Sequence, residues 1–155
     1  MKFKSQLMTT DEIMRALRRI AHQITERNNG ADNVVIVGIA KGGVPIANQL
    51  SEFLKTIEQC NIPTGVLDIS GHRDDIEPHK VDDAKVNESV IPCDINGKNV
   101  VLVDDVLYTG RTARAAFDAL SDYGRAGTIQ LAVLIDRGHR ELPIRADYVG
   151  KNIPT

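Results

Sequence analysis

The chain has 155 residues, of which 42% are hydrophobic and 26% are charged, the balance of an ordinary globular protein with one domain. Its 19 basic and 21 acidic residues give a formal net charge of −2, which excludes a polycation that holds nucleic acid by overall charge. The apolar runs are no longer than strands and the first residues lack the apolar stretch of a secretory signal, so we expect no membrane span and no export. Cys60 and Cys93 stand alone without metal-ligand spacing, which favours a reducing cytoplasm over a disulfide or a metal site.

The charge is distributed unevenly along the chain. Residues 1–30 carry six basic and three acidic side chains and residues 137–155 carry four and two, whereas residues 66–96 carry three and eight. A slightly acidic protein with two basic segments can present one basic face to a polyanion. The alternative is that these charges only coat a solvated surface.

Hydrophobic periodicity predicts an amphipathic helix over residues 9–28, which starts with the capping-box pattern Thr9-x-x-Glu12. The continuous apolar run 33–39 is typical of a strand that is buried on both faces. A second helix is expected over residues 44–59, with its proline in the first turn.

The second half of the chain repeats this alternation of strands and helices. Residues 70–97 are polar, acidic and without periodicity, which is typical of a mobile functional loop. A third helix is expected over residues 111–123. Further strands are predicted at 65–69, 100–104, 128–135 and 146–150. The sequence therefore predicts an α/β domain with a mostly parallel sheet, in which ligands bind beyond the carboxyl ends of the strands.

The strongest chemical pattern follows the strand predicted over 100–104, where Asp104 and Asp105 stand together. The turn Thr109–Thr112, which comes next, offers main-chain N–H groups at a helix N-terminus, a glycine and two hydroxyls, all suited to a phosphate monoester. Carboxylates repel phosphate, but they accept hydrogen bonds from the vicinal hydroxyls of a sugar. The pattern thus predicts a ligand with a phosphate beside a ribose. An ordinary strand–helix junction explains one acid and one cap, but not two acids beside such a turn.

The segment Val-Asp-Asp-Val-Leu-Tyr-Thr-Gly-Arg-Thr at 103–112 resembles the phosphoribosyl-pyrophosphate (PRPP) signature of type I phosphoribosyltransferases. In this version it is similar to that of the pyrimidine operon attenuation regulators, which are bifunctional proteins with uracil phosphoribosyltransferase activity. The resemblance extends to residues 15–22, 73–75 and 130–155, and so covers most of the chain. It implies one domain over residues 1–155, with a mostly parallel central sheet flanked by helices and a mobile loop at about 70–97. It also implies that a C-terminal tail typical of the family is absent, and with it a sheet edge or a subunit contact.

The resemblance implies transfer of ribose 5-phosphate from PRPP to uracil, which gives UMP and pyrophosphate with Mg²⁺ as the cofactor. Asp104 and Asp105 would stabilise the oxocarbenium character of the ribose, and Arg73 would reach over the pyrophosphate. Uracil would lie near Ile135, Asp136 and Arg137. The residues implied in binding PRPP or UMP are Ala40, Lys41, Gly42, Gly43, Asp104, Asp105, Val106, Leu107, Tyr108, Thr109, Gly110, Arg111 and Thr112.

The resemblance also implies a second partner, a stem-loop of the pyrimidine operon leader mRNA, whose binding depends on UMP or UTP and promotes transcription attenuation. Phosphates and unpaired loop bases would meet a basic surface. Homodimers or higher homo-oligomers are also expected. The residues implied in RNA binding are Arg15, Arg18, Arg19, His22, His139, Arg140, Arg145 and Lys151.

The chain departs from the family pattern in one loop and at two single positions. Lys41-Gly42-Gly43 replaces a Thr-Arg-Gly loop and loses the bidentate arginine, His72 replaces a tyrosine, and Arg18 replaces a threonine. Two alternatives therefore remain open. One is a purine-type phosphoribosyltransferase without RNA binding, and the other is an RNA-binding attenuator with negligible catalysis.

Overall fold

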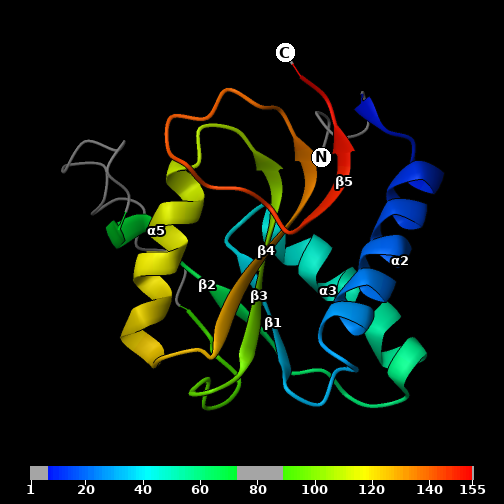
Figure 1. Ribbon diagram of the computed structural model, residues 1–155, viewed down its shortest axis with the longest axis vertical. Helices are drawn as coiled ribbons and strands as arrows, with labels where there is room; N and C mark the ends of the chain where they lie inside the picture. Colours follow the sequence, from blue (N-terminus) through cyan, green and yellow to red (C-terminus); the bar gives the residue numbers. More distant parts are fainter. Residues whose placement is uncertain (1–6, 73–88, 155) are drawn as a thin grey trace.

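A five-stranded sheet with helices on both faces forms the centre of the molecule (Figure 1). The computed structural model describes residues 7–72 and 89–154. The strand order is β2-β1-β3-β4-β5, and all four neighbouring pairs are parallel. This architecture confirms the predicted α/β fold, because strands that are apolar on both sides need a helical layer on each face.

The strands keep to the predicted segments with one informative difference. β3 runs on through the acidic pair, because Asp104 and Val106 still pair with Val133 and Ile135 of β4. The two carboxylates therefore leave the backbone within the strand rather than beyond its end, and successive side chains of a strand point to opposite faces. The strands are β1 Val34–Ile39, β2 Thr64–Leu67, β3 Asn99–Leu107, β4 Thr128–Asp136 and β5 Tyr148–Asn152.

Helices α2 (Thr10–Arg27) and α3 (Gly43–Glu58) cover one face of the sheet, and α5 (Arg111–Leu120) covers the other. The predicted capping box is present, since Thr9 Oγ1 accepts a hydrogen bond from the Glu12 N–H and the Glu12 carboxylate accepts one from the Thr9 N–H. Helix α5 ends three residues earlier than predicted. Ser121 donates its hydroxyl to the Asp118 carbonyl, and the chain tightens there into a 3₁₀ turn.

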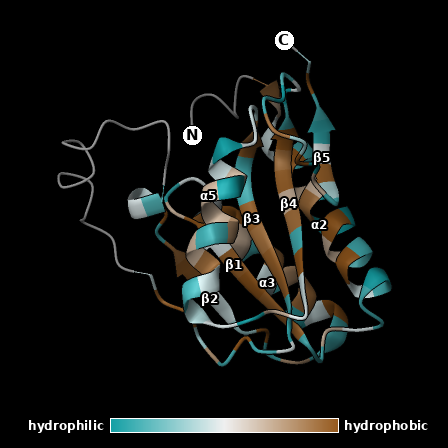
Figure 2. Ribbon diagram, turned by 60° about the vertical axis from the view of Figure 1, so that its left-hand side comes forward, coloured by the Kyte–Doolittle hydropathy of each residue, from teal (hydrophilic) through white to brown (hydrophobic). Residues whose placement is uncertain are grey.

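The two faces of the sheet hold two apolar cores. Leu17, Ile20 and Ile24 of α2 pack toward one face, whereas Leu102 of β3 and Leu120 of α5 are buried on the other. Figure 2 shows the hydrophobic colour concentrated on the strands and on the inward sides of the helices. Within the described residues, no helix combines the length and the apolar character needed to cross a bilayer.

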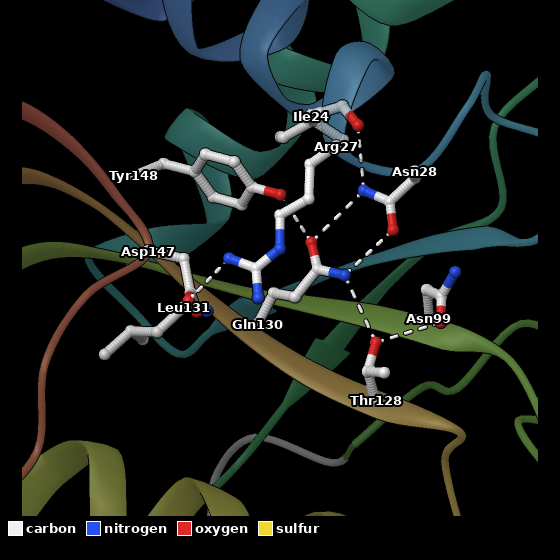
Figure 3. A network of polar contacts seen from close by, with 9 residues as sticks. All are labelled: Ile24, Arg27, Asn28, Asn99, Thr128, Gln130, Leu131, Asp147 and Tyr148. Atoms are coloured by element: carbon white, nitrogen blue, oxygen red, sulfur yellow. Dashed lines mark hydrogen bonds and ion pairs between the residues drawn. The ribbon is translucent and has the colours of Figure 1, made fainter.

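A polar network fixes the C-terminal end of α2 to β4 and β5 (Figure 3). The buried Gln130 of β4 exchanges hydrogen bonds with the side chain of Asn28, and its Oε1 also accepts the hydroxyl of Tyr148 at 2.5 Å. Arg27 forms an ion pair with Asp147 at 2.7 Å. Burial raises the pKa of Tyr148, so its hydroxyl remains a donor at neutral pH.

Tyr148→Phe is expected to lower the free energy of unfolding by about 1–2 kcal/mol, because it removes a partner of a buried amide. Urea denaturation would measure the change. Tyr123→Phe, at a ring that is 43% exposed, is the matched control and should cost less than about 0.5 kcal/mol. Equal losses in the two variants would contradict a stabilising role for the network.

Candidate active site

A cavity of about 210 Å³ lies where β3 runs into α5. It is lined by Asp104 of β3, by Thr109, Gly110 and Thr112 of the following turn, and by apolar side chains of the sheet such as Ile39. The carboxyl end of a central parallel strand is the expected location for a ligand in this kind of sheet. The structure therefore places Asp104, which is predicted to bind the ribose, and the turn that is predicted to bind the phosphate in the wall of one cavity.

The turn before α5 leaves the N-terminus of this helix open. Gly110 occupies the N-cap position with φ +95°, a conformation that favours glycine, and supplies no side-chain cap of its own. The first turn of α5 contains no acidic residue. Thr109 Oγ1 accepts the Arg111 N–H at 3.2 Å. Unprotonated phosphate oxygens would meet N–H groups and the positive end of the helix dipole here.

The two carboxylates of the signature have different surroundings. Asp104 lines the cavity, and one of its oxygens accepts the Asp105 N–H at 2.8 Å. Asp105 lies against the loop after β1, and one of its oxygens accepts the Val106 N–H at 2.8 Å. These local hydrogen bonds restrain both side chains. Of the two acids, Asp104 therefore lines this cavity, whereas Asp105 packs against the loop after β1.

The loop Ala40–Gly43, which joins β1 to α3, lies close to the backbone of β3. A Cβ atom built on Gly43 would be 2.0 Å from the Val103 carbonyl oxygen, and one on Gly42 would be 2.5 Å from Asp105 Oδ2. The Ala40–Lys41 peptide bond is cis, and Lys41 is exposed. Glycine is therefore required here by close approach, and the loop presents one exposed cationic side chain, Lys41.

A third group of polar residues lies at the end of β4. Asp136 Oδ1 accepts the Gly138 N–H at 2.9 Å, and Oδ2 accepts a hydrogen bond from Arg140 at 2.5 Å. Burial alone would raise the pKa of Asp136, but these hydrogen bonds and the charge of Arg140 outweigh it and hold the pKa below its usual value. Asp136 is therefore ionised at neutral pH.

The loop after β4 lies across the outside of the turn that follows β3 (Figure 1). The Thr109 carbonyl accepts the N–H groups of Glu141 and Leu142, at 2.8 and 3.2 Å. The Glu141 carboxylate pairs with Arg111 at 2.7 Å. Sequence reasoning did not single out Glu141, and no local pattern could have done so, because the two partners lie thirty positions apart.

The residues predicted to hold uracil lie at this end of β4. The side chain of Ile135 is fully buried, so only its main chain is available to a ligand. The Arg137 guanidinium lies 4.5 Å from the centre of the Tyr108 ring, and the His139 ring packs against the same tyrosine at 5.5 Å. A half-exposed aromatic side chain with two basic neighbours thus forms the rim of the cavity. Arg73 lies outside the described residues.

The basic residues of the predicted RNA surface lie on α2, on β5 and on the loop after β4. Arg15, Arg18, Arg19 and His22 are exposed on α2, and Lys151 of β5 lies 3.8 Å from Glu12 of this helix. Arg19 donates to the carbonyls of Val149 and Gly150, and Arg18 lies over the ring of Phe53. His139 and Arg145 are exposed on the loop after β4, whereas Arg140 is turned inward and hydrogen-bonded within that loop. Arg140 is thus less exposed than the other residues that the resemblance implies in RNA binding.

A family model named phosphoribosyl transferase domain matches residues 4–154. The chain belongs to the phosphoribosyltransferase family. The bifunctional protein PyrR of Deinococcus deserti is 55% identical to it over 152 residues, which cover 98% of this chain and 82% of that protein. The bifunctional protein PyrR of Thermus aquaticus is 56% identical over 155 residues, 100% of this chain and 85% of that protein. Within the family the chain is thus a member of the PyrR group, which confirms the resemblance predicted from the sequence.

Solved structures show the same fold. A hypoxanthine phosphoribosyltransferase from Staphylococcus aureus superposes with a TM-score of 0.70 at 22% identity, over 96% of this chain and 77% of that chain. The Trypanosoma cruzi enzyme in complex with the product IMP gives 0.71 at 20% identity, over 94% and 73% of the two chains. At this level of identity the likeness supports the architecture and not the choice of base.

Gly43→Ala is expected to lower the free energy of unfolding by about 1–3 kcal/mol, because the added methyl group would displace the backbone of β3. Thermal or urea unfolding would measure the loss. Gly71→Ala is the control, since its Cβ would meet no described atom within 4 Å. Equal stability of the two variants would contradict the close packing of this loop on β3.

The lowered pKa of Asp136 predicts a pH-dependent contribution to stability. Because the pKa is lower in the folded state, the contribution is present above the unfolded-state value of about 4 and is lost as the pH falls through the folded-state value. Asp136→Asn is expected to destabilise the protein at pH 7, with a difference from wild type that shrinks as the pH falls below the unfolded-state value of about 4. A difference that is constant with pH, measured by urea unfolding, would refute this assignment.

Proposed function

We propose that this protein transfers ribose 5-phosphate from PRPP to N1 of uracil, and that it binds pyrimidine operon leader mRNA in response to uridine nucleotides. The observation that carries the catalytic half is the cavity shared by Asp104 and the turn residues Thr109, Gly110 and Thr112. A carboxylate for the sugar hydroxyls and an open helix N-terminus for the phosphate are what a phosphoribosyl group needs. Identity above 50% to proteins named bifunctional PyrR supports both halves.

In this proposal, charged groups from three segments of the chain stabilise the charges that develop as PRPP reacts. Asp104 and Asp105 stabilise positive charge as the bond from C1 to pyrophosphate breaks. The Ala40–Gly43 loop faces the pyrophosphate with main-chain groups and the Lys41 ammonium, and Arg73 adds a second cation. Uracil is held at Ile135, Asp136 and Arg137, mainly through the main chain. The remaining signature residues, Val106 to Thr112, enclose the phosphoribosyl group.

The residues at this site fit a Mg²⁺ ion that arrives with its substrate. Among the described residues, no three metal-ligating side chains lie close enough together to form a closed protein site. Mg²⁺ commonly uses one or two carboxylates together with phosphate oxygens, and Asp104 and Asp105 are suitable for that part. When bound, the ion would neutralise charge on the leaving pyrophosphate.

The proposed RNA surface combines the exposed cations of α2 with Lys151 of β5 and with the exposed basic residues of the loop after β4. Arg and Lys side chains would contact phosphates, and the Tyr108–His139 pair offers aromatic surface to an unpaired base. Arg15, Arg18, Arg19, His22, His139, Arg145 and Lys151 are all exposed, as such contacts require. We further propose that the protein acts in the cytoplasm, because its two exposed cysteines are free, as in a reducing compartment. We also propose that the chain forms one domain and assembles into homo-oligomers.

The proposal is tested by incubating the protein with PRPP, Mg²⁺ and labelled uracil, hypoxanthine or xanthine, alongside a gel shift with leader RNA at fixed salt. UMP formation and an RNA affinity that changes with UMP are the expected results. Turnover of a purine base in place of uracil would favour a purine phosphoribosyltransferase. RNA binding without any turnover would favour an attenuator that has lost catalysis. The absence of both activities would refute the proposal.

Arg15→Gln is expected to weaken binding to leader RNA and to reduce the slope of log affinity against log salt by about one, as loss of one phosphate contact does. Filter binding at several salt concentrations would measure both quantities. Arg125→Gln removes an exposed guanidinium at the opposite end of the sheet and serves as the control. An equal loss in the two variants would indicate nonspecific attraction instead of a defined RNA surface.

A further inference from the structure

The guanidinium of Arg140 donates to four acceptors, which lie at the end of β4, in the loop after it and in the turn after β3. Its Nε donates to the Ile144 carbonyl at 2.8 Å, and Nη2 donates to the Asp136 carboxylate at 2.5 Å. Its Nη1 donates to the carbonyls of Tyr108 and Gly138, at 2.9 and 3.1 Å. The side chain is only 23% exposed. Most of its hydrogen-bonding capacity is therefore directed into the protein and not toward a partner in solution.

The bond to the Tyr108 carbonyl fixes the direction of the next N–H group. In a trans peptide the C=O and the N–H point in opposite directions, so the Thr109 N–H points away from Arg140. The Thr109 carbonyl is held by Glu141 and Leu142 on the same loop, which fixes the Gly110 N–H in the same way. Thr109 and Gly110 both line the cavity. The loop after β4 thus holds the outer side of the turn, and the donors of the turn are left for a ligand.

We propose that Arg140 is a positioning residue for the phosphate of the bound nucleotide, because it holds the Tyr108 carbonyl and so orients the Thr109 N–H toward the cavity. This inference rests on the proposed function, since it assumes that the turn Thr109–Thr112 receives the phosphate. It assigns Arg140 a role within the nucleotide site in addition to the RNA surface predicted from the sequence.

The electrostatic surroundings support a geometric role over a charge-based one. The Asp136 carboxylate neutralises the guanidinium at hydrogen-bond distance, so little net charge remains for long-range attraction. Lysine would retain the charge, but a single ammonium group cannot reproduce a planar fork that reaches four acceptors. Arg140→Lys and Arg140→Gln should therefore have similar effects. If charge were the essential property, lysine would restore function.

The test compares a ligand that has the phosphate with one that lacks it. Dissociation constants for UMP and uridine are measured by competition in the uracil transfer assay for wild type, Arg140→Lys, Arg140→Gln and the control Arg125→Gln. We expect UMP affinity to fall about tenfold or more in both Arg140 variants, with uridine affinity unchanged within about twofold. The KM for PRPP should rise by a similar factor, and Arg125→Gln should behave as wild type.

The other outcomes each overturn a specific part of this proposal. Unchanged UMP affinity in both variants refutes the inference, and loss of RNA affinity alone would assign Arg140 to RNA phosphate contact. Restoration by lysine would show that charge matters more than geometry. Equal weakening of UMP and uridine, with a lower melting temperature, would show a purely structural role. If wild type neither forms UMP nor binds it, the proposed function itself fails.

Discussion

The parallel pairing of β3 with β1 and β4 is the constraint on which the rest of the structure depends. Its register carries the ends of three strands to one edge of the sheet, so that the loop after Ile39, the acidic pair of β3 and Asp136 of β4 lie together. These groups are far apart in the sequence, and no local interaction would assemble them. Burial of the apolar cores on both faces of the sheet offsets the conformational entropy lost when the segments between these strands are closed into loops.

The polar groups at this edge hold one another in place. Asp104 and Asp105 accept hydrogen bonds from the main chain of their own strand, and Asp136 is paired with Arg140. Groups that are already fixed need little reorganisation when charge develops in a ligand, which is the basis of electrostatic catalysis in preorganised sites. The same rigidity links the cavity beside Asp104 with the loop that contains His139 and Arg145, so the two proposed activities share structural elements.

Much of this arrangement could be predicted from the sequence, because the signals were local. The capping box at Thr9, the apolar strands and the Asp-Asp pair before a glycine turn each depend on neighbouring residues. The length of β3 could not be predicted in this way. Its acidic pair stays within the strand because β4 continues beside it, and that pairing is not visible in the local sequence. The inward position of Arg140 was also out of reach, because its acceptors at Tyr108 and Ile144 are brought together only by the tertiary fold.

Arg19 shows what a fixed side chain can contribute on an exposed helix. One terminal nitrogen of its guanidinium donates to two successive carbonyls of β5, at 3.0 and 2.7 Å, and so fastens the side chain across a helix–strand boundary. A long arginine normally loses considerable rotamer entropy when it grips a partner. Here that loss has already occurred during folding, so an anionic ligand that reaches this surface would meet a cation with restricted motion and a lower entropic barrier to association.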